Sequence, residues 1–226
     1  MRNVFLFLVL ILPFLPVFSQ AQEYSYAHYG IAEGLAGATV YSLTQDRDGF
    51  LWAGTETGLS RFDGTHFTNF TTKDGLPGVE VLQVFADSRG RVWMALLGRS
   101  VCYYYQGRIH TGQNDSLLRR IRLTGNVNGF AEDPAGNILF PDMECLHVIR
   151  ADGTLLDIDS IGHLPVRDCL AVGTSASGHF LTVLGKKIVE FSCRLSREST
   201  ENRASISNVA GAQGASANSD RDTSFS

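Results

Sequence analysis

The chain is poor in cysteine and in positive charge, and it lacks the short motifs of common catalytic and metal sites. Its 226 residues include four Cys, and 19 Lys and Arg stand against 23 Asp and Glu, for a net charge of −4. With no basic domain, nucleic acid is not an expected partner. No C-x-x-C pair occurs, and the six histidines have no metal-ligand spacing, so neither a metal nor a cofactor is predicted.

Catalytic motifs are also missing. No phosphate-binding loop and no G-x-S-x-G motif occur, and Gly173-Thr174-Ser175-Ala176-Ser177 fails the latter pattern at its last position. The one basic cluster, 119–122, is expected to be a solvated loop or edge strand rather than a phosphate site. We therefore predict no catalytic residue.

The cysteines do not form an obvious disulfide framework. Cys102, Cys145 and Cys169 lie in strand-like apolar runs, and Cys193 follows another. An exported chain permits disulfides. Small buried core residues remain the favoured interpretation for the first three.

What the sequence does contain is a repeat. Trp52 and Trp93 lie 41 residues apart, and the surrounding pattern recurs with them. The recurring pairs are Tyr26 and Phe67, Tyr29 and Phe70, Gly34 and Gly75, Leu35 and Leu76, Val40 and Val81, Leu43 and Val84, Asp46 and Asp87, and Gly49 and Gly90. A period near 40 built from short apolar runs and glycine turns is typical of the four-stranded blade of a β-propeller.

One repeat resolves into four expected strands, at 40–43, 50–53, 59–62 and 65–70. The turn Asp46–Gly49 closes the first pair. Asp63-Gly64 predicts a type I′ hairpin, which needs positive φ at both central residues. Alternation with period two and hairpin spacing predicts an antiparallel meander, and no helical stripe of useful length occurs.

Weaker copies follow, so that blade turns are expected at 46–49, 87–90, 133–136 and 175–178, with an insertion around 112–122. The fourth unit ends before its last strand. The predicted fold is all-β: about four four-stranded antiparallel units over residues 22–193, forming an incomplete or open propeller arc.

Both ends of the chain differ from the repeats. Residues 1–21 have a cationic start, an apolar run and small residues at Ser19 and Ala21, which predicts a signal-peptide helix cleaved after Ala21. An uncleaved anchor is the alternative, but the apolar run has 15 residues and contains Pro13 and Pro16. A span needs about 20. Residues 194–226 are serine-rich and nearly free of large apolar side chains, and we expect a disordered low-complexity tail.

Two features of the repeat have a functional and a structural interpretation. The turn Asp46–Gly49 superficially resembles a calcium loop, but position twelve is Thr57 instead of a liganding Glu. A turn in which the Asp carboxylate accepts backbone N–H groups is favoured. Trp52 and Trp93 are expected to fill the space between blades, with a sugar-stacking platform as the alternative.

The repeat resembles a known family. Gly34-Leu35, then Asp46, Gly49, Leu51-Trp52, Gly54-Thr55 and Gly58-Leu59, followed by Arg61-Phe62-Asp63-Gly64 and Phe67, are similar to the two-component regulator propeller repeat. The second copy keeps Gly75-Leu76-Pro77, Asp87, Gly90 and Trp93 but has Ala95-Leu96 where Gly-Thr is usual. In that family, exported propellers precede a sandwich domain, a transmembrane helix and a cytoplasmic histidine kinase.

The resemblance implies an exported, periplasmic sensor of glycans or other surface cues. This chain contains no kinase parts, so we expect a non-catalytic propeller segment of a larger sensor, with a carbohydrate or other extracellular ligand and downstream sensor modules as partners. No membrane span is expected in the mature chain. The alternatives are an exported hydrolase or lyase, and a structural or adhesion scaffold. The ligand-binding residues are unknown from the sequence, because rim loops and ordinary turns look alike.

Overall fold

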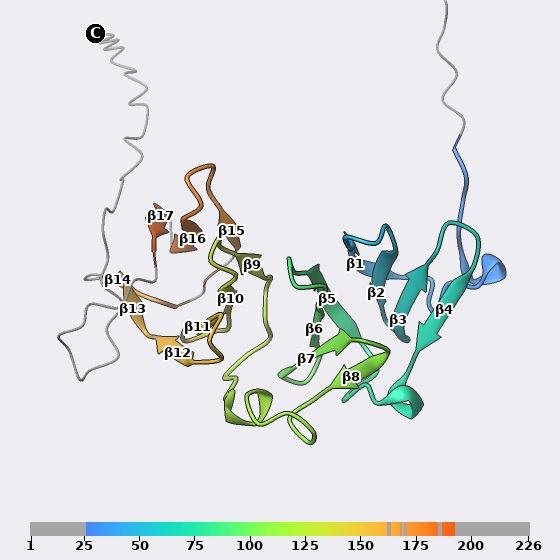
Figure 1. The fold of residues 1–226 in the computed structure, drawn as a ribbon, viewed down its shortest axis with the longest axis horizontal. Helices are drawn as coiled ribbons and strands as arrows, with labels where there is room; N and C mark the ends of the chain where they lie inside the picture. The colour runs from blue at the N-terminus through green and yellow to red at the C-terminus, as the bar shows by residue number, and fades with distance from the viewer. Residues whose placement is uncertain (1–25, 162–163, 168, 170, 185–186, 193–226) are drawn as a thin grey trace, which may run out of the picture.

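The computed structural model describes residues 26–161, 164–167, 169, 171–184 and 187–192 (Figure 1). The expected signal peptide, 1–21, and the expected tail, 194–226, lie outside the described residues. The helical elements in the described part of the chain are three short 3-10 helices: η2 (Ile31–Glu33), η3 (Thr72–Asp74) and η4 (Leu118–Arg120). The remaining elements are strands, so the all-β prediction is confirmed.

The first three sheets are antiparallel meanders in which each strand pairs with the next along the chain. Blade 1 consists of β1 (Val40–Gln45), β2 (Leu51–Thr55), β3 (Gly58–Phe62) and β4 (Phe67–Phe70). Blade 2 consists of β5 (Val81–Ala86), β6 (Val92–Leu96), β7 (Ser100–Tyr105) and β8 (Arg108–His110). Blade 3 consists of β9 (Ala131–Glu132), β10 (Ile138–Pro141), β11 (Leu146–Ile149) and β12 (Leu155–Ile158).

Blade 4 has three strands within the described residues: β15 (Val172–Thr174), β16 (Phe180–Leu184) and β17 (Lys187–Phe191). A small hairpin, β13 (Ser160–Ile161) with β14 (Leu164–Pro165), lies between blades 3 and 4. The predicted insertion is present as the connection 111–130, which carries η4. Four units in the predicted order are therefore confirmed.

One predicted turn is wrong. The Asp63 N–H donates to the His66 carbonyl at 3.2 Å, so the central residues of the β3–β4 turn are Gly64 and Thr65, and Asp63 precedes them. Of the predicted pair, only Gly64 has a positive φ, +99°. Asp63 stabilises the turn with its carboxylate instead, which accepts from the backbone N–H groups of Thr65 and His66 at 2.7 Å each.

A two-residue turn with two positive φ angles occurs instead in blade 2. There β7 and β8 are joined by Gln106 and Gly107, with φ of +48° and +82°. Both residues being left-handed is the condition for the type I′ turn, which matches the twist of the flanking strands. The repeat thus keeps the hairpin while the turn type varies from blade to blade.

The core lies between the blades. One cluster of buried side chains joins blades 1 and 2, a second joins blades 2 and 3, and a third joins blades 3 and 4. Trp52 is 1% exposed and packs with Val81 and Met94 of blade 2. Trp93 is fully buried and packs with Phe130, ahead of blade 3. The prediction that both tryptophans fill inter-blade space is confirmed.

Within the described residues, no core cluster covers the outer face of blade 1. Val40 and Leu43 of β1 are 44% and 61% exposed. Their repeat equivalents in β5, Val81 and Val84, are 0% and 6% exposed because blade 1 packs on them. No core cluster of the described residues joins blade 4 to blade 1, and Figure 1 shows these two blades at opposite ends of an arc.

Candidate functional site: two pockets at opposite rims

Every blade presents two kinds of loop, at opposite ends. In an antiparallel meander the first-to-second and third-to-fourth strand turns share one end. We call this end the turn rim; in blade 3 it holds the loops 133–137 and 150–154. The opposite end, the connection rim, holds the second-to-third strand turn, 142–145, and the connections between blades. A pocket at the turn rim lies between blades 3 and 4, and a pocket at the connection rim lies between blade 3 and the β13–β14 hairpin.

The aspartates of the turn rim bind the blade itself. The Asp46 carboxylate accepts from the backbone N–H groups of Asp48 and Phe50 at 3.0 Å each, and from the indole N–H of Trp52 at 2.7 Å. Asp87 does the same for Trp93, at 2.9 Å. These contacts are those of an aspartate that closes its own turn, which agrees with the turn interpretation of Asp46–Gly49. The buried tryptophans are also closed to a stacking sugar.

Blade 3 replaces the indole with another donor. Leu139 occupies the tryptophan position, and the Asn137 side-chain amide donates to Asp133 at 2.7 Å. The Asn137 side-chain carbonyl accepts from the Ala151 N–H at 3.0 Å and thereby ties the two turn-rim loops of the blade together. This exchange of donor explains how the repeat survives the loss of its tryptophan.

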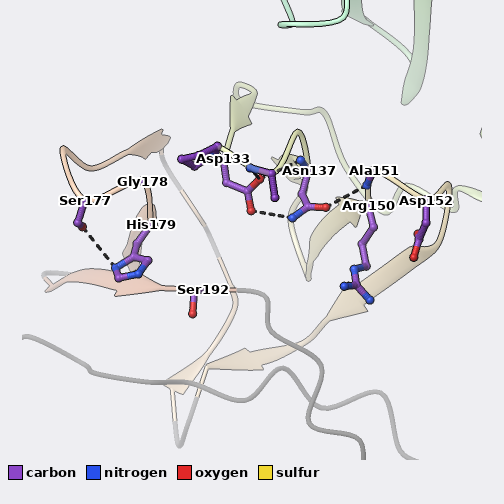
Figure 2. A pocket seen from close by; sticks show the side chains of 11 residues that line it. Asp133, Asn137, Arg150, Ala151, Asp152, Ser177, Gly178, His179 and Ser192 are labelled. Carbon is purple, nitrogen blue, oxygen red and sulfur yellow. Dashed lines mark hydrogen bonds between the residues drawn. The ribbon is translucent and has the colours of Figure 1, made fainter.

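The turn-rim pocket has a volume of about 660 Å³ and is lined by several polar and charged side chains (Figure 2). Figure 2 shows Arg150 and Asp152 on one side of it, Ser177 and His179 on the other, and Asp133 with Asn137 between them. Within the described part of the chain, the Arg150 guanidinium makes no hydrogen bond or ion pair. Its five N–H donors are therefore available beside the cavity.

The blade 4 side of this pocket is a small hydrogen-bonded cluster. Glu190 accepts from the hydroxyls of Ser175 and Ser177 at 2.7 Å each and contacts the His179 ring at 3.2 Å. Hydrogen bonds to its carboxylate, above all the one from the Ser175 hydroxyl, lower the pKa of Glu190. Ser175, part of the near-miss of the hydrolase motif, is thus a turn residue bound to a carboxylate.

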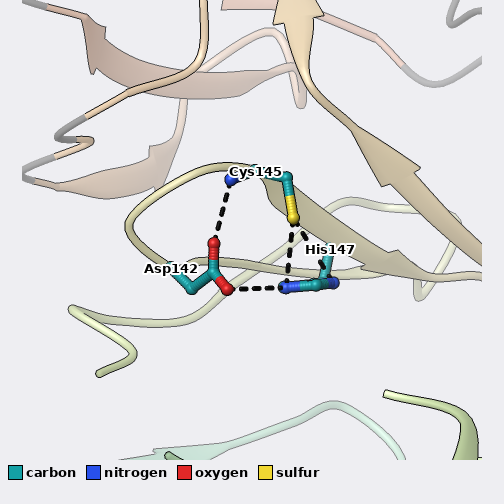
Figure 3. Close-up of side chains that lie close together, drawn as sticks. All are labelled: Asp142, Cys145 and His147. Carbon is teal, nitrogen blue, oxygen red and sulfur yellow. Dashed lines mark hydrogen bonds and ion pairs between the residues drawn. The ribbon is translucent and has the colours of Figure 1, made fainter. Parts of the chain in front are cut away.

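The connection-rim pocket, about 610 Å³, lies beside an aspartate, a cysteine and a histidine. Asp142 and Cys145 belong to the β10–β11 turn, and His147 lies in β11 (Figure 3). The His147 Nε2 lies 3.4 Å from both the Cys145 Sγ and an Asp142 carboxylate oxygen. Its other nitrogen, Nδ1, lies 2.7 Å from the carboxylate of Asp157 in β12. Cys145 and Asp157 line the cavity.

Asp142 also organises its own turn. One carboxylate oxygen accepts from the N–H groups of Glu144 and Cys145, and the other accepts from the N–H and hydroxyl of Thr124 at 2.7 and 2.8 Å. Burial alone would raise the pKa of Asp142, but these hydrogen bonds outweigh it and hold the pKa well below its usual range.

The cysteines fit the prediction in two of three cases. Cys102 and Cys169 are buried and free, and burial raises the pKa of both thiols. Cys145 is half-buried, so its assignment as a buried core residue is wrong. Of the three, only Cys102 lies in a strand, since Cys145 precedes β11 and Cys169 precedes β15. Burial and the neighbouring carboxylates raise its pKa to about 12. Cys193 lies outside the described residues.

The basic cluster binds the backbone. Arg119 donates to the carbonyls of Gly112 and Gln113 at 3.0 Å each, and Arg120 donates to that of Gly153 at 3.0 Å. Arg122 donates to carbonyls within its own turn. The cluster lies at η4 and in the residues after it. These contacts agree with the expectation that it is a loop rather than a phosphate site.

A comparison with known protein families identifies the repeat of blade 1. Residues 34–57, from the connection before β1 to the β2–β3 turn, match the family described as two component regulator propeller. This stretch of blade 1 matches the regulator propeller repeat. A 69-residue stretch, 30% of the chain, is 36% identical to histidine kinase P4 of Formosa agariphila. The chain spans 5% of that kinase's length.

Several solved structures are similar in fold to this chain. The extracellular domain of the hybrid two component system BT3049 of B. thetaiotaomicron matches 81% of the chain with a TM-score of 0.60 at 15% identity. The extracellular domain of BT4673 from the same organism matches 73% with a TM-score of 0.57 at 21% identity. The chain covers 28% and 22% of these two structures.

A propeller enzyme shares the fold as well. Virginiamycin B lyase of Staphylococcus aureus matches 70% of the chain with a TM-score of 0.55 at 15% identity. At such identities the likeness shows the propeller fold and not a function. Among the residues that the structure describes, no helix has the length and apolar character to cross a lipid bilayer.

Proposed function

We propose that this chain is the extracytoplasmic ligand-sensing propeller region of a two-component sensor and that it is not itself catalytic. The observation that carries the proposal is the regulator propeller repeat, supported by the 36% identity of one stretch to a histidine kinase. In such a sensor, ligand binding shifts the packing of the propeller against downstream modules, provided that the two packing states differ in affinity for the ligand.

The turn-rim pocket supplies the binding surface in this proposal. Its cavity of about 660 Å³ lies between blades 3 and 4, so a ligand there contacts two blades at once. Asp133 and Asn137 bind each other, whereas Arg150 and Asp152 extend at its edge. A carbohydrate is the ligand class of choice, because its hydroxyl or carboxylate groups match this mixture of guanidinium, carboxylate and hydroxyl groups.

Arg150→Ala is expected to weaken saccharide binding at least tenfold, because a hydrogen bond to a charged donor contributes about 1.5–3 kcal/mol. An oligosaccharide panel screened against the full chain identifies the ligand, and isothermal titration measures its affinity. Arg108→Ala, at an exposed arginine of blade 2, is the matched control and should leave affinity unchanged. Equal effects of the two variants, or no binding across the panel, would contradict this assignment of the pocket.

The competing class is an exported propeller hydrolase or lyase. The same panel tests it directly, because an enzyme releases shortened or unsaturated products while a sensor returns the saccharide intact. Product formation by the wild-type chain would replace the sensor proposal. A scaffold without a signalling role would bind a surface glycan and show no dependence of kinase activity on it in the complete sensor.

Export is part of the proposal. The cationic start, the proline-interrupted apolar run and Ser19-Gln20-Ala21 support cleavage after Ala21 and a periplasmic mature chain. Amino-terminal sequencing of exported material is expected to begin at Gln22, or within about two residues of it. Recovery of intact Met1 in the membrane fraction would favour the anchored alternative.

A further inference from the structure

The connection rim of blade 3 brings together three side chains with metal-binding atoms. An Asp142 carboxylate oxygen, the Cys145 Sγ and a His147 ring nitrogen all lie within 4.8 Å of one another (Figure 3). Asp142 and His147 are fully buried, and Cys145 is half-buried. Sequence spacing did not reveal this set, because the residues fit no familiar metal motif.

The histidine is oriented by a fourth residue. Its Nδ1 lies 2.7 Å from the Asp157 carboxylate, which favours the tautomer in which Nδ1 carries the hydrogen. In the tautomer with its hydrogen on Nδ1, Nε2 carries a lone pair directed toward the Asp142 oxygen at 3.4 Å. The Cys145 Sγ lies over the ring, 3.4 Å from Nε2 and 4.0 Å from Nδ1, so it ligates the same ion once its side chain rotates toward Asp142. A carboxylate that accepts from the distal nitrogen of a metal-bound histidine is a recurring arrangement in metalloproteins.

Two of the three separations, those from His147 Nε2, match a tetrahedral ion, and the third, from Cys145 Sγ to the Asp142 oxygen, is within 4.8 Å. With Zn–S near 2.3 Å and Zn–N near 2.0–2.1 Å, sulfur and nitrogen ligands lie about 3.5 Å apart, and nitrogen and oxygen ligands about 3.3 Å apart. The observed distances of His147 Nε2 to Cys145 and to Asp142 are both 3.4 Å. Ligating carboxylates are themselves usually hydrogen-bonded, as Asp142 is to Thr124.

The charge around the cluster distinguishes a cation site from a catalytic cysteine. Cys145, His147 and Asp157 have the order of a nucleophile, a base and an orienting acid. However, Asp142 contacts the same histidine nitrogen, and Glu144 and Asp159 add carboxylates to the cavity, against the single guanidinium of Arg167. Such a negative surrounding opposes a free thiolate, whereas a divalent cation offsets it.

We propose that Asp142, Cys145 and His147 bind a zinc ion at the connection rim, with Asp157 as a positioning residue for His147. Mixed sulfur, nitrogen and oxygen donors in tetrahedral arrangement suit Zn²⁺ better than Mg²⁺ or Ca²⁺, which prefer oxygen alone. Three protein ligands leave a fourth position, which lies beside the cavity of about 610 Å³ and can accept water or a ligand group. The proposal does not depend on the sensor function.

The test is metal titration of the full chain after treatment with a chelator. Elemental analysis is expected to find one zinc per chain. Cobalt(II), used as a spectroscopic probe, should give the intense visible bands of a tetrahedral site and a thiolate-to-cobalt charge-transfer band. Cys145→Ser should abolish the charge-transfer band, and His147→Gln should weaken zinc affinity at least tenfold.

Two further variants separate a metal site from a merely structural cluster. Asp157→Asn keeps all three ligands and should weaken zinc binding about 10–100-fold, as is usual for a partner of a ligating histidine. His66→Gln, at an exposed histidine of blade 1, should change neither stoichiometry nor spectrum. Circular dichroism of each variant establishes that it is folded.

Three results would overturn the proposal. They are no cobalt spectrum with the wild-type chain, a spectrum without a thiolate band, and zinc uptake that persists unchanged in folded Cys145→Ser and His147→Gln. In the first case the cluster is a hydrogen-bonded network that joins Asp142, His147 and Asp157 without a metal ion. In the last, the ion sits on surface carboxylates.

Discussion

Trp93→Ala is expected to lower the free energy of unfolding by about 3–5 kcal/mol. Its indole is fully buried, packs at 5.0 Å between ring centroids against Tyr103, and donates to Asp87. Removing it leaves a cavity between blades 2 and 3 and leaves Asp87 with one donor fewer. Denaturant unfolding measures the loss in a longer form of the protein whose repeats close the ring, because the chain alone is not expected to unfold cooperatively. A stabilising osmolyte keeps the native baseline measurable.

Two companion variants define the cause. Trp93→Phe keeps most of the apolar surface but removes the N–H donor, and should cost less than the alanine variant. Tyr26→Ala truncates an aromatic side chain that is 90% exposed and should have almost no effect. If Trp93→Ala left stability intact but abolished ligand binding, the tryptophan would be a binding platform instead of an inter-blade filler.

The chain by itself is expected to be marginally stable, because the outer face of blade 1 exposes apolar side chains and an open arc has a second such end. Leaving several hundred Å² of apolar surface exposed at about 25 cal/mol/Å² forfeits on the order of 10 kcal/mol per end, comparable with the roughly 5–15 kcal/mol net stability of a domain. Val40 and Leu43 show this exposure directly at blade 1. We expect broad, non-cooperative melting, rapid proteolysis and concentration-dependent association.

Equivalent positions in successive repeats supply the control. Val84→Ser removes a buried contact and should cost about 1.5–3 kcal/mol, whereas Leu43→Ser should cost little and should reduce association. Light scattering and calorimetry read the two effects separately. A sharp two-state transition of a monodisperse wild-type monomer would show that the terminal faces are adequately covered.

The blades were predictable from the sequence because their signals are local. Trp52 and Trp93 mark strands, and glycines such as Gly49 and Gly90, with φ of +90° and +81°, mark turns that need a left-handed residue. The bond from Asp46 to Trp52 was missed although both residues repeat together, six positions apart. Both residues of this hydrogen bond recur with the 41-residue period, but spacing alone does not show that the carboxylate of a turn accepts from an indole N–H.

The candidate sites depended on strand register, which no short pattern shows. Cys145 and His147 are close in sequence, but Asp157 reaches His147 only because β11 and β12 pair these two residues directly. The turn-rim pocket likewise needs two blades side by side. The hairpin prediction at Asp63-Gly64 was wrong because the pair of residues does not show where the turn is centred. The Asp63 carboxylate caps the turn, so the backbone of Asp63 need not adopt a positive φ.

The Asp–Trp hydrogen bond means that each 41-residue unit of blades 1 and 2 contains both sets of side chains that form an interface between neighbouring blades. The carboxylate of Asp46 fixes the indole of Trp52 within blade 1, and the receiving positions, Val81 and Val84, recur in every well-preserved copy of the unit. Duplicating the unit in a gene therefore duplicates both halves of an interface together. The number of blades can therefore change by whole units without a new interface having to arise. A blade such as the third can lose its tryptophan and still pack against its neighbours, because Asn137 supplies the hydrogen-bond donor to the turn aspartate.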